Sequence, residues 1–526
     1  MKMKSKLALS GLSFMAGTGY FTKKYFETAD GKRYGWDKVN DFAYSLCKGI
    51  ASLVPDDHYP YVFEYDNKGF MKGNEEISDK PCDNAKWSCG YSKVSLLPDD
   101  VGTGTYYVGG YLHLPPNVAT DVLDDQMFRC IALSDGRATS VFGVIDCVGI
   151  SNHDIRDIRL MLEDFCKENN IVSINISSIH AHSEIDTQGL WGDLFGAIKN
   201  NPMVVISGKG ELMSGRNDEH MRNLKIRCAE AIRRAVTDMK TGKLYTSLMD
   251  GSRFMRDKRP PYVMLTDILN LRFMPDDGST PTRAVCMSAH PTQLLDSNKS
   301  ISADYPYYLC DEIEKNGENA LFFQSAELAV ATERAGNVPE GLDRMGEIIE
   351  YGRAIGRYCI ANFEANKKEA TPLLNVRIHE HLIKVDNYLF MLIGRMRLVT
   401  NNIVKIGDKK SDIRFATEIG MVKIGDDMNI AMVPGELAPE LLVGGCFGKD
   451  EAYNHEDWNY APMKDNVDGY LHCIGLCNDA IGYIVPDNDF GSVIAPLHYE
   501  EAVSTGKHAA SSIVEVFEKV AQEFRK

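Results

Sequence analysis

The stretch HDIRDIRLMLEDFCKENNIVSINISSIHAH, residues 153–182, gives the clearest indication of the fold class. Apolar residues recur at helical spacing in its first half, and IVSINISSI in its second half is an apolar run typical of a buried strand. Just upstream, FRCIALSDGRATSVFGVIDCVGI (128–150) contains two apolar runs separated by SDGRA, which predicts a β-hairpin. Strands and a helix in this order are expected to pack as layers.

The same alternation of strands and helices continues toward the C-terminus. Residues from about 30 to 105 have weak periodicity, which predicts loops and short elements. No solenoid-type repeat or linker-like segment divides the chain. We therefore predict an α/β fold in which residues 30–526 form a single large layered domain, with mixed sheets and flanking helices. The predicted helices are 218–239, 340–364 and 509–524, and the predicted strands are 263–273, 282–289 and parts of 428–442 and 471–486.

Composition excludes some classes of partner. The 526 residues include 58 Lys and Arg against 74 Asp and Glu, and a formal charge of −16 opposes binding to nucleic acid. The 13 cysteines lack a regular framework, which predicts reduced, buried thiols and a reducing compartment. The sequence does not indicate an oligomeric state.

Residues 1–29 are expected to be separate from the main domain. Three lysines precede an apolar run over residues 7–21, and two more follow it. The run is shorter than the roughly 20 residues that a membrane-spanning helix needs. It predicts peripheral membrane association, and a surface-packed terminus is the alternative. The expected location is therefore the cytoplasm or a membrane surface.

Candidate chemistry begins at the end of the strand IVSINISSI, where His180 and His182 follow one residue apart. Residues i and i+2 of a strand point to the same side, so both imidazoles are able to face one cleft. Two interpretations stay open at this point: a metal-binding pair, or two hydrogen-bonded polar residues that close a strand.

Three other apolar strands end in a residue that can bind a metal. His290 ends TRAVCMSAHPTQL, Glu436 follows MNIAMVPG, and Tyr483 lies in GLCNDAIGYIVP. Individually, Glu436 also fits a first-turn glutamate of a helix, and Tyr483 fits a packed core tyrosine. Together with His180 they offer the nitrogen and oxygen donors of a catalytic zinc site with space for a water molecule. Their convergence is not visible in the sequence.

Several segments resemble the neutral ceramidase family in wording and order, over about residue 105 to the C-terminus. The resemblance implies a zinc-dependent hydrolase in which His180, His290, Glu436 and Tyr483 bind zinc. It also implies that His182 hydrogen-bonds the reacting carbonyl and that Arg253 lies near the same oxyanion, with Arg256 as the alternative. The segments are YVGGYLHLPPNVATDVLDDQMFRCIALSDG, VIDCVGIS, SSIHAHSE, AHPTQL, VPGELAPEL, GLCNDAIGYIVP and YEEAVSTGKH.

One departure from the family concerns a catalytic serine. Family members carry a segment like G-D-V-S-P, whereas ALFFQSAELAVATER here has Val330, Ala331 and Thr332 at the expected place. Ala331 has no hydroxyl. Adjacent strand residues face opposite ways, so neither Thr332 nor Ser325 replaces it without a change of register. The immunoglobulin-like C-terminal domain of some larger relatives is also expected to be absent.

The resulting prediction is a zinc-dependent hydrolase that cleaves an amide bond of a small-molecule or lipid-like substrate. One alternative keeps the metal site but acts on a glycoconjugate, lactone or ester, by hydrolysis or elimination. Another is an inactive binding protein. His379 and His381 in VRIHEHLIKVD predict an exposed polar strand face, not a metal site, and SGKGELMSG (207–215) predicts a flexible loop instead of a phosphate-binding loop.

Overall fold

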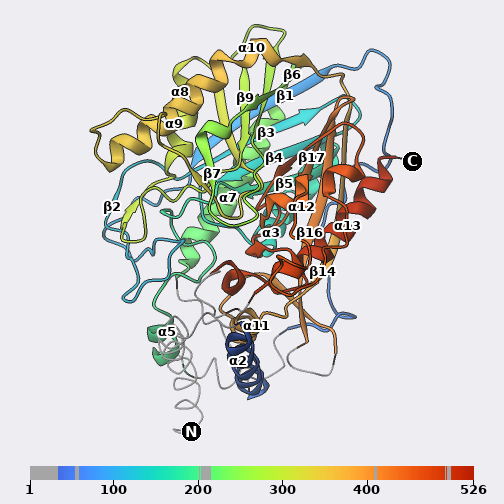
Figure 1. Ribbon diagram of the computed structural model, residues 1–526. Helices are drawn as coiled ribbons and strands as arrows, with labels where there is room; N and C mark the ends of the chain where they lie inside the picture. Colours follow the sequence, from blue (N-terminus) through green and yellow to red (C-terminus); the bar gives the residue numbers. More distant parts are fainter. Residues whose placement is uncertain are drawn as a thin grey trace.

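A computed structural model describes residues 33–53, 59–200, 215–407, 412–491 and 499–525, together with positions 202 and 493. The segment 1–29 lies outside the described residues, and so does SGKGELMSG except for Gly215. Figure 1 shows sheets at the centre of the molecule, with helices along their outer sides. None of the described helices has both the length and the apolar character needed to cross a membrane.

The larger of the two main sheets has nine strands within the described residues, in the order β11-β9-β8-β6-β1-β3-β4-β5, with β13 paired to β6. Two of its pairs, β4–β5 and β9–β11, are parallel, whereas the others are antiparallel, so the sheet is mixed. Its strands are β1 (Trp87–Ser95), β3 (Met127–Ser134), β4 (Thr139–Ile145), β5 (Ile171–Ser178), β6 (Lys240–Asp250), β8 (Asp267–Pro275), β9 (Thr282–Met287), β11 (Asn319–Gln324) and β13 (Lys368–Glu369).

The second main sheet, with five described strands, has the order β14-β16-β17-β19, with β15 paired to β16. It is also mixed, because β17 and β19 are parallel and the other pairs are antiparallel. Its strands are β14 (Leu374–Lys384), β15 (Asn402–Lys405), β16 (Ile413–Ile424), β17 (Met428–Met432) and β19 (Tyr470–Ile474). Smaller pairs complete the described strands: β2 (Asp121–Val122) with β10 (Ser300–Ile301), β7 (Met255–Asp257) with β12 (Val330–Thr332), and β18 (Glu436–Leu437) with β20 (Tyr483–Ile484).

Side-chain alternation along the strands explains the layers. Ile131 and Leu133 of β3 belong to a buried apolar cluster shared with Val422 of the second sheet. The intervening Cys130 and Ala132 belong to a different cluster, formed with helices on the opposite side. One face of the larger sheet therefore packs on the second sheet and the other on helices.

Helices cover the outer sides of the two sheets (Figure 1). Helix α7 packs on β1 and β3, α8 packs on β11 and α9, and α13 packs on β14 and β16. The described α-helices are α2 (Arg33–Leu53), α3 (Asn152–Met161), α4 (Glu163–Glu168), α5 (Leu194–Asn200), α7 (Asp218–Thr237), α8 (Tyr305–Lys315), α9 (Arg344–Ala361), α10 (Phe363–Asn366), α11 (Tyr388–Arg395), α12 (Pro439–Val443) and α13 (Ala509–Glu523).

The α/β class with mixed sheets and flanking helices is confirmed, as are the hairpin β3–β4 and the strand β5. The expected helix over 153–169 is divided at Leu162, whose N–H bonds to the carbonyl of Arg159. The prediction of only loops and short elements between 30 and 105 is wrong, because this region contains the 21-residue helix α2 and the nine-residue strand β1. Serine, glycine and lysine interrupt the apolar pattern of β1, which hid it from the sequence analysis.

The predicted state of the cysteines is also confirmed. None of the 13, all within the described residues, forms a disulfide, and 11 of them are buried. His379 and His381 lie on β14 as predicted, but their expected exposure is wrong. Both are half-buried against α13, where their Nε2 atoms lie 2.5 Å from Glu523 and from the Ser512 hydroxyl, respectively.

Candidate metal centre

Backbone hydrogen bonds bring four separate parts of the chain to one place. The N–H of His182 donates to the carbonyl of Pro291 at 3.2 Å, and the N–H of His290 donates to the carbonyl of Val330 at 2.9 Å. In the β18–β20 pair, Glu436 is directly opposite Tyr483. The N–H of Leu328, just before β12, donates to the carbonyl of Leu437 in β18 at 3.2 Å. The end of β5, the segment after β9, β12 and the β18–β20 pair therefore converge, which the sequence analysis left open.

The imidazoles and carboxylates of this region form a compact buried cluster. The Nε2 atoms of His290 and His180 lie 3.0 and 3.2 Å from the same carboxylate oxygen of Glu436. His182 Nε2 lies 3.0 Å from His180 Nε2. Glu327 Oε2 lies 3.7 Å from His290 Nδ1. The group His180, His290, Glu327 and Glu436 can hold a metal ion, as can the three histidines.

The chemistry of the donors fits a cation such as zinc. The Nδ1 atoms of His180 and His290 lie 2.7 and 3.2 Å from the carbonyls of Val148 and Val330, which can only accept, so each Nδ1 carries the proton. Each ring is therefore held by an outer carbonyl at Nδ1 and turns its Nε2, the atom that binds a metal in the neutral ring, toward Glu436. Tetrahedral zinc ligands are separated by about 3.4 Å, close to the separations found here.

When no metal ion is bound, the negative charges of the cluster are balanced by protons on its own side chains. The pKa of each group therefore depends on the charge of its neighbours. Burial alone lowers the pKa of His180, but the negative charges of Glu436 and Glu327 outweigh it and raise the pKa to about 9. Burial likewise opposes ionisation of Glu436, yet the two histidines hold its pKa well below the usual range. Burial raises the pKa of Glu327. The buried negative charge therefore favours a positive charge on His180.

His182 differs from its neighbours because it is only half-buried. Burial of its ring, with repulsion from His180 and His290, holds its pKa well below the ordinary value, so the imidazole is neutral. The backbone of Gly110 is so close that a β-carbon there would be 2.6 Å from His182 atoms. A neutral ring fixed in this way is suited to hydrogen-bond a ligand.

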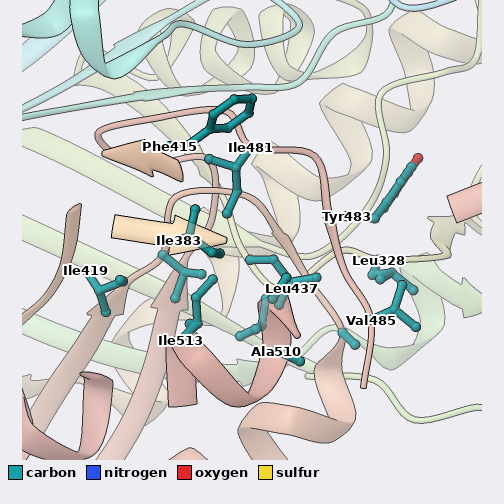
Figure 2. Packing of buried hydrophobic residues seen from close by; sticks show 14 of the residues in the cluster. Leu328, Ile383, Phe415, Ile419, Leu437, Ile481, Tyr483, Val485, Ala510 and Ile513 are labelled. Atoms are coloured by element: carbon teal, nitrogen blue, oxygen red, sulfur yellow. The ribbon is translucent and has the colours of Figure 1, made fainter. Parts of the chain in front are cut away.

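Two tyrosine hydroxyls are positioned beside the cluster. Tyr483 Oη lies 3.5 Å from His290 Nε2 and 3.3 Å from Tyr499 Oη. Figure 2 shows Tyr483 near residues of the apolar cluster that contains Leu437, with its hydroxyl pointing away from Leu437. Burial, and then the charge of Glu436, raises the pKa of Tyr483 well above its usual value.

A cavity of about 640 Å³ is open to this cluster. His180, His182, His290, Glu436 and Tyr483 line it. Much of the remaining wall is apolar and includes Leu112, Leu190, Trp191, Phe390, Val399 and Val503. An apolar cavity with a few convergent polar groups is the usual form of a small-molecule site.

Arg253 is not among the described residues that line this cavity. It is exposed, and its guanidinium donates to the Asn337 side chain at 2.7 Å and to the Gly336 carbonyl. The alternative, Arg256, is exposed as well and lies 3.9 Å from Glu333. The oxyanion role of either arginine therefore has no support from this geometry and stays a prediction.

Ala331 lines the cavity, so the position at which the resemblance predicts a serine lies in the wall of the candidate site. Ala329 lines it too, with a positive φ of 59°. Both residues contribute to the wall, so a serine substituted at either position would place its hydroxyl at the cavity.

The sequence analysis missed Glu327 and Tyr499. Glu327 follows β11 as His290 follows β9, so the pattern of an apolar strand that ends in a metal-binding residue was available. Tyr499 had no comparable signal, because its place beside Tyr483 depends on the tertiary fold.

The mixed sheets and flanking helices resemble the fold of a ceramidase catalytic domain. A scan of the sequence against models of protein families gives no match, and neither does a search of curated proteins. Among solved structures, the chain is similar to the neutral ceramidase from Pseudomonas aeruginosa, with a TM-score of 0.61 and 14% identity over 84% of this chain and 75% of that one. A ceramidase complexed with C2 gives the same TM-score and identity over 84% and 76%. These similarities show the fold alone.

Proposed function

We propose that the protein is a zinc-dependent hydrolase of N-acyl amides. The observation that carries the proposal is the convergence of the Nε2 atoms of two histidines on the Glu436 carboxylate at 3.0 and 3.2 Å, in the wall of an apolar cavity. When bound, zinc supplies Lewis-acid chemistry that activates water and polarises an acyl carbonyl. The residues that would hold it are His180, His290, Glu436 and Tyr483.

The other residues of the site would position the substrate. His182 lines the cavity next to His180, so its neutral imidazole is placed to donate a hydrogen bond to an acyl oxygen as negative charge develops there. Ala329 and Ala331 provide no side-chain nucleophile, which favours attack by water. Glu327 would orient the His290 ring from its Nδ1 side.

The shape and lining of the cavity support an acyl chain as part of the substrate. Leu190, Phe390 and Val399 give it apolar walls. Its volume of about 640 Å³ admits roughly 20 groups of the size of a water molecule. We therefore propose that amides with short or medium acyl chains are enclosed completely, whereas longer chains extend into solvent.

A substrate panel tests this proposal. Zinc-loaded protein would be incubated with N-acyl amides of increasing chain length and with matched esters, and the released fatty acid would be measured. We expect turnover of at least one amide, loss of activity on chelation, and recovery when zinc is restored. Absence of turnover across the panel, in a protein that contains zinc, would contradict the proposal and favour a binding protein.

A further inference from the structure

A single cationic side chain of the lysine or arginine type, Lys258, is found among the described residues that line the cavity. It follows β7 directly and is itself exposed, so it stands at the opening of the cavity. The histidine and glutamate cluster lies in the buried part of the same wall. A ligand that reaches the cluster with one end is therefore able to approach Lys258 with the other.

The backbone at Lys258 is fixed on both sides. Its N–H donates to the carbonyl of Ala329 at 3.1 Å, and the preceding Asp257 is paired with Val330 between β7 and β12. The following Arg259 is buried, and its guanidinium pairs with Asp489 and Glu501 at 3.1 Å each. Lys258 is thus attached to the strand that contacts His290, and its position relative to the cluster is set by the fold.

Among the described carboxylates, Glu500 offsets part of the charge of Lys258 without forming an ion pair with it. Lys258 forms no ion pair with any described carboxylate, whereas the neighbouring Arg259 pairs with Asp489, Glu500 and Glu501. Glu500 also lines the cavity, but it pairs with Arg259 at 3.3 Å. Partial burial, and then repulsion from Arg256, lowers the pKa of the Lys258 ammonium. A negative group at the opening would relieve both effects.

We infer that Lys258 selects substrates that carry an anionic group, so that the preferred amides are N-acyl amino acids or related N-acyl carboxylates. This inference rests on the proposed function, because it assigns the acyl chain to the apolar interior and the amide to the cluster. The carboxylate is then on the amine side of the amide and faces the opening. A carboxylate at the far end of the acyl chain offers the same chemistry from the other direction.

Binding measurements test the inference separately from turnover. The probes are N-decanoylglycine and N-decanoylglycinamide, which differ in charge but hardly in shape, and the amide of a ten-carbon dicarboxylic acid, which carries its carboxylate on the acyl side. Isothermal titration would compare wild-type protein with Lys258→Met, Lys258→Arg and the control Lys80→Met. Lys80 is exposed and outside the described cavity wall, and its substitution changes the net charge equally.

Wild-type protein should bind N-decanoylglycine about 2- to 5-fold more tightly than the glycinamide, as expected for one partly exposed ion pair. Lys258→Met should abolish the preference, Lys258→Arg and Lys80→Met should keep it, and added salt should weaken it. Equal binding of the two glycine probes by wild-type protein, or a preference that survives in Lys258→Met, would overturn the inference. Preference for the dicarboxylic probe alone would overturn the assignment to the amine side.

Turnover of the same probes shows which proposal has failed. If the glycinamide is hydrolysed to decanoate without any preference for the glycine probe, the amidase proposal stands and the role of Lys258 is refuted. If neither probe is hydrolysed but binding depends on Lys258, the anion site stands and the amidase proposal is refuted.

Discussion

Glu436→Gln is the substitution that tests the metal centre most directly. The change replaces a carboxylate by an amide of nearly the same shape, at a side chain whose one oxygen lies 3.0 and 3.2 Å from two histidines. Zinc sites with four protein ligands bind with about 10–16 kcal/mol, or roughly 3 kcal/mol per ligand. Loss of the charged ligand should therefore weaken zinc binding by about 100-fold.

Thermal unfolding gives a second readout of the same loss. Free zinc at 100 times the dissociation constant stabilises the folded protein by about 2.7 kcal/mol. For 526 residues the unfolding entropy is about 1.1 kcal/mol/K, so the melting temperature should rise by roughly 2–3 °C. At the same zinc concentration Glu436→Gln should gain less than about 0.5 °C, because its site would be only half occupied.

Glu440→Gln is the matched control for this experiment. Glu440 lies four residues further along the chain, is also buried, and is not part of the candidate metal group. Competition with a chromogenic chelator would give the zinc affinity of each protein. Unchanged affinity in Glu436→Gln, or an equal loss in both variants, would refute the assignment of Glu436 as a ligand.

Four further substitutions test other parts of the structure. His182→Ala should lower kcat by about 10²- to 10³-fold with little loss of bound zinc, since it removes a hydrogen-bond donor to the reacting oxygen; equal kcat would exclude that role. Ala329→Ser and Ala331→Ser should leave zinc content unchanged, and activity found only in one of them would show that the wild-type wall lacks a required hydroxyl. Burial, with Arg227 and Arg216, lowers the pKa of His220 to about 4. The contribution of neutral His220 to folding stability is therefore complete above pH 6.5 and is lost as the pH falls toward 4. Urea unfolding should show that wild-type protein loses roughly 2 kcal/mol more stability than His220→Gln between pH 7.5 and 4.5, and parallel losses would contradict this.

Features with a local cause could be predicted from the sequence. The hairpin β3–β4, the strand β5 and the helices α7, α9 and α13 have apolar residues at the period of their own secondary structure. His180, His290 and Glu436 could be found because each follows such a strand. Their convergence could not, because it depends on backbone pairing between residues more than a hundred positions apart, such as His182 and Pro291.

Features with a tertiary cause were missed. Strand β1 pairs with β3 and β6 in the middle of the larger sheet, yet its serines and lysine suggested a loop. Glu327 looks like an ordinary polar residue after a strand until the fold places it beside His290. Lys258 has no sequence signal at all, since its significance is that it lines the cavity without an ion pair to any carboxylate in the described part of the chain.

Several features of the cluster are unfavourable for folding stability, which argues that the cluster binds a ligand and does not serve only a structural role. His180 has a left-handed backbone with φ of 65°, which is unfavourable for a residue other than glycine. Glu327 is fully buried, and its Oε1 has no hydrogen-bond partner, while Glu436 holds a buried charge between two imidazoles. A core that needed only stability would be better served by apolar residues at these positions. All three unfavourable features occur together, in the wall of the cavity or against it. This is the pattern expected of a site that is kept because it binds a ligand.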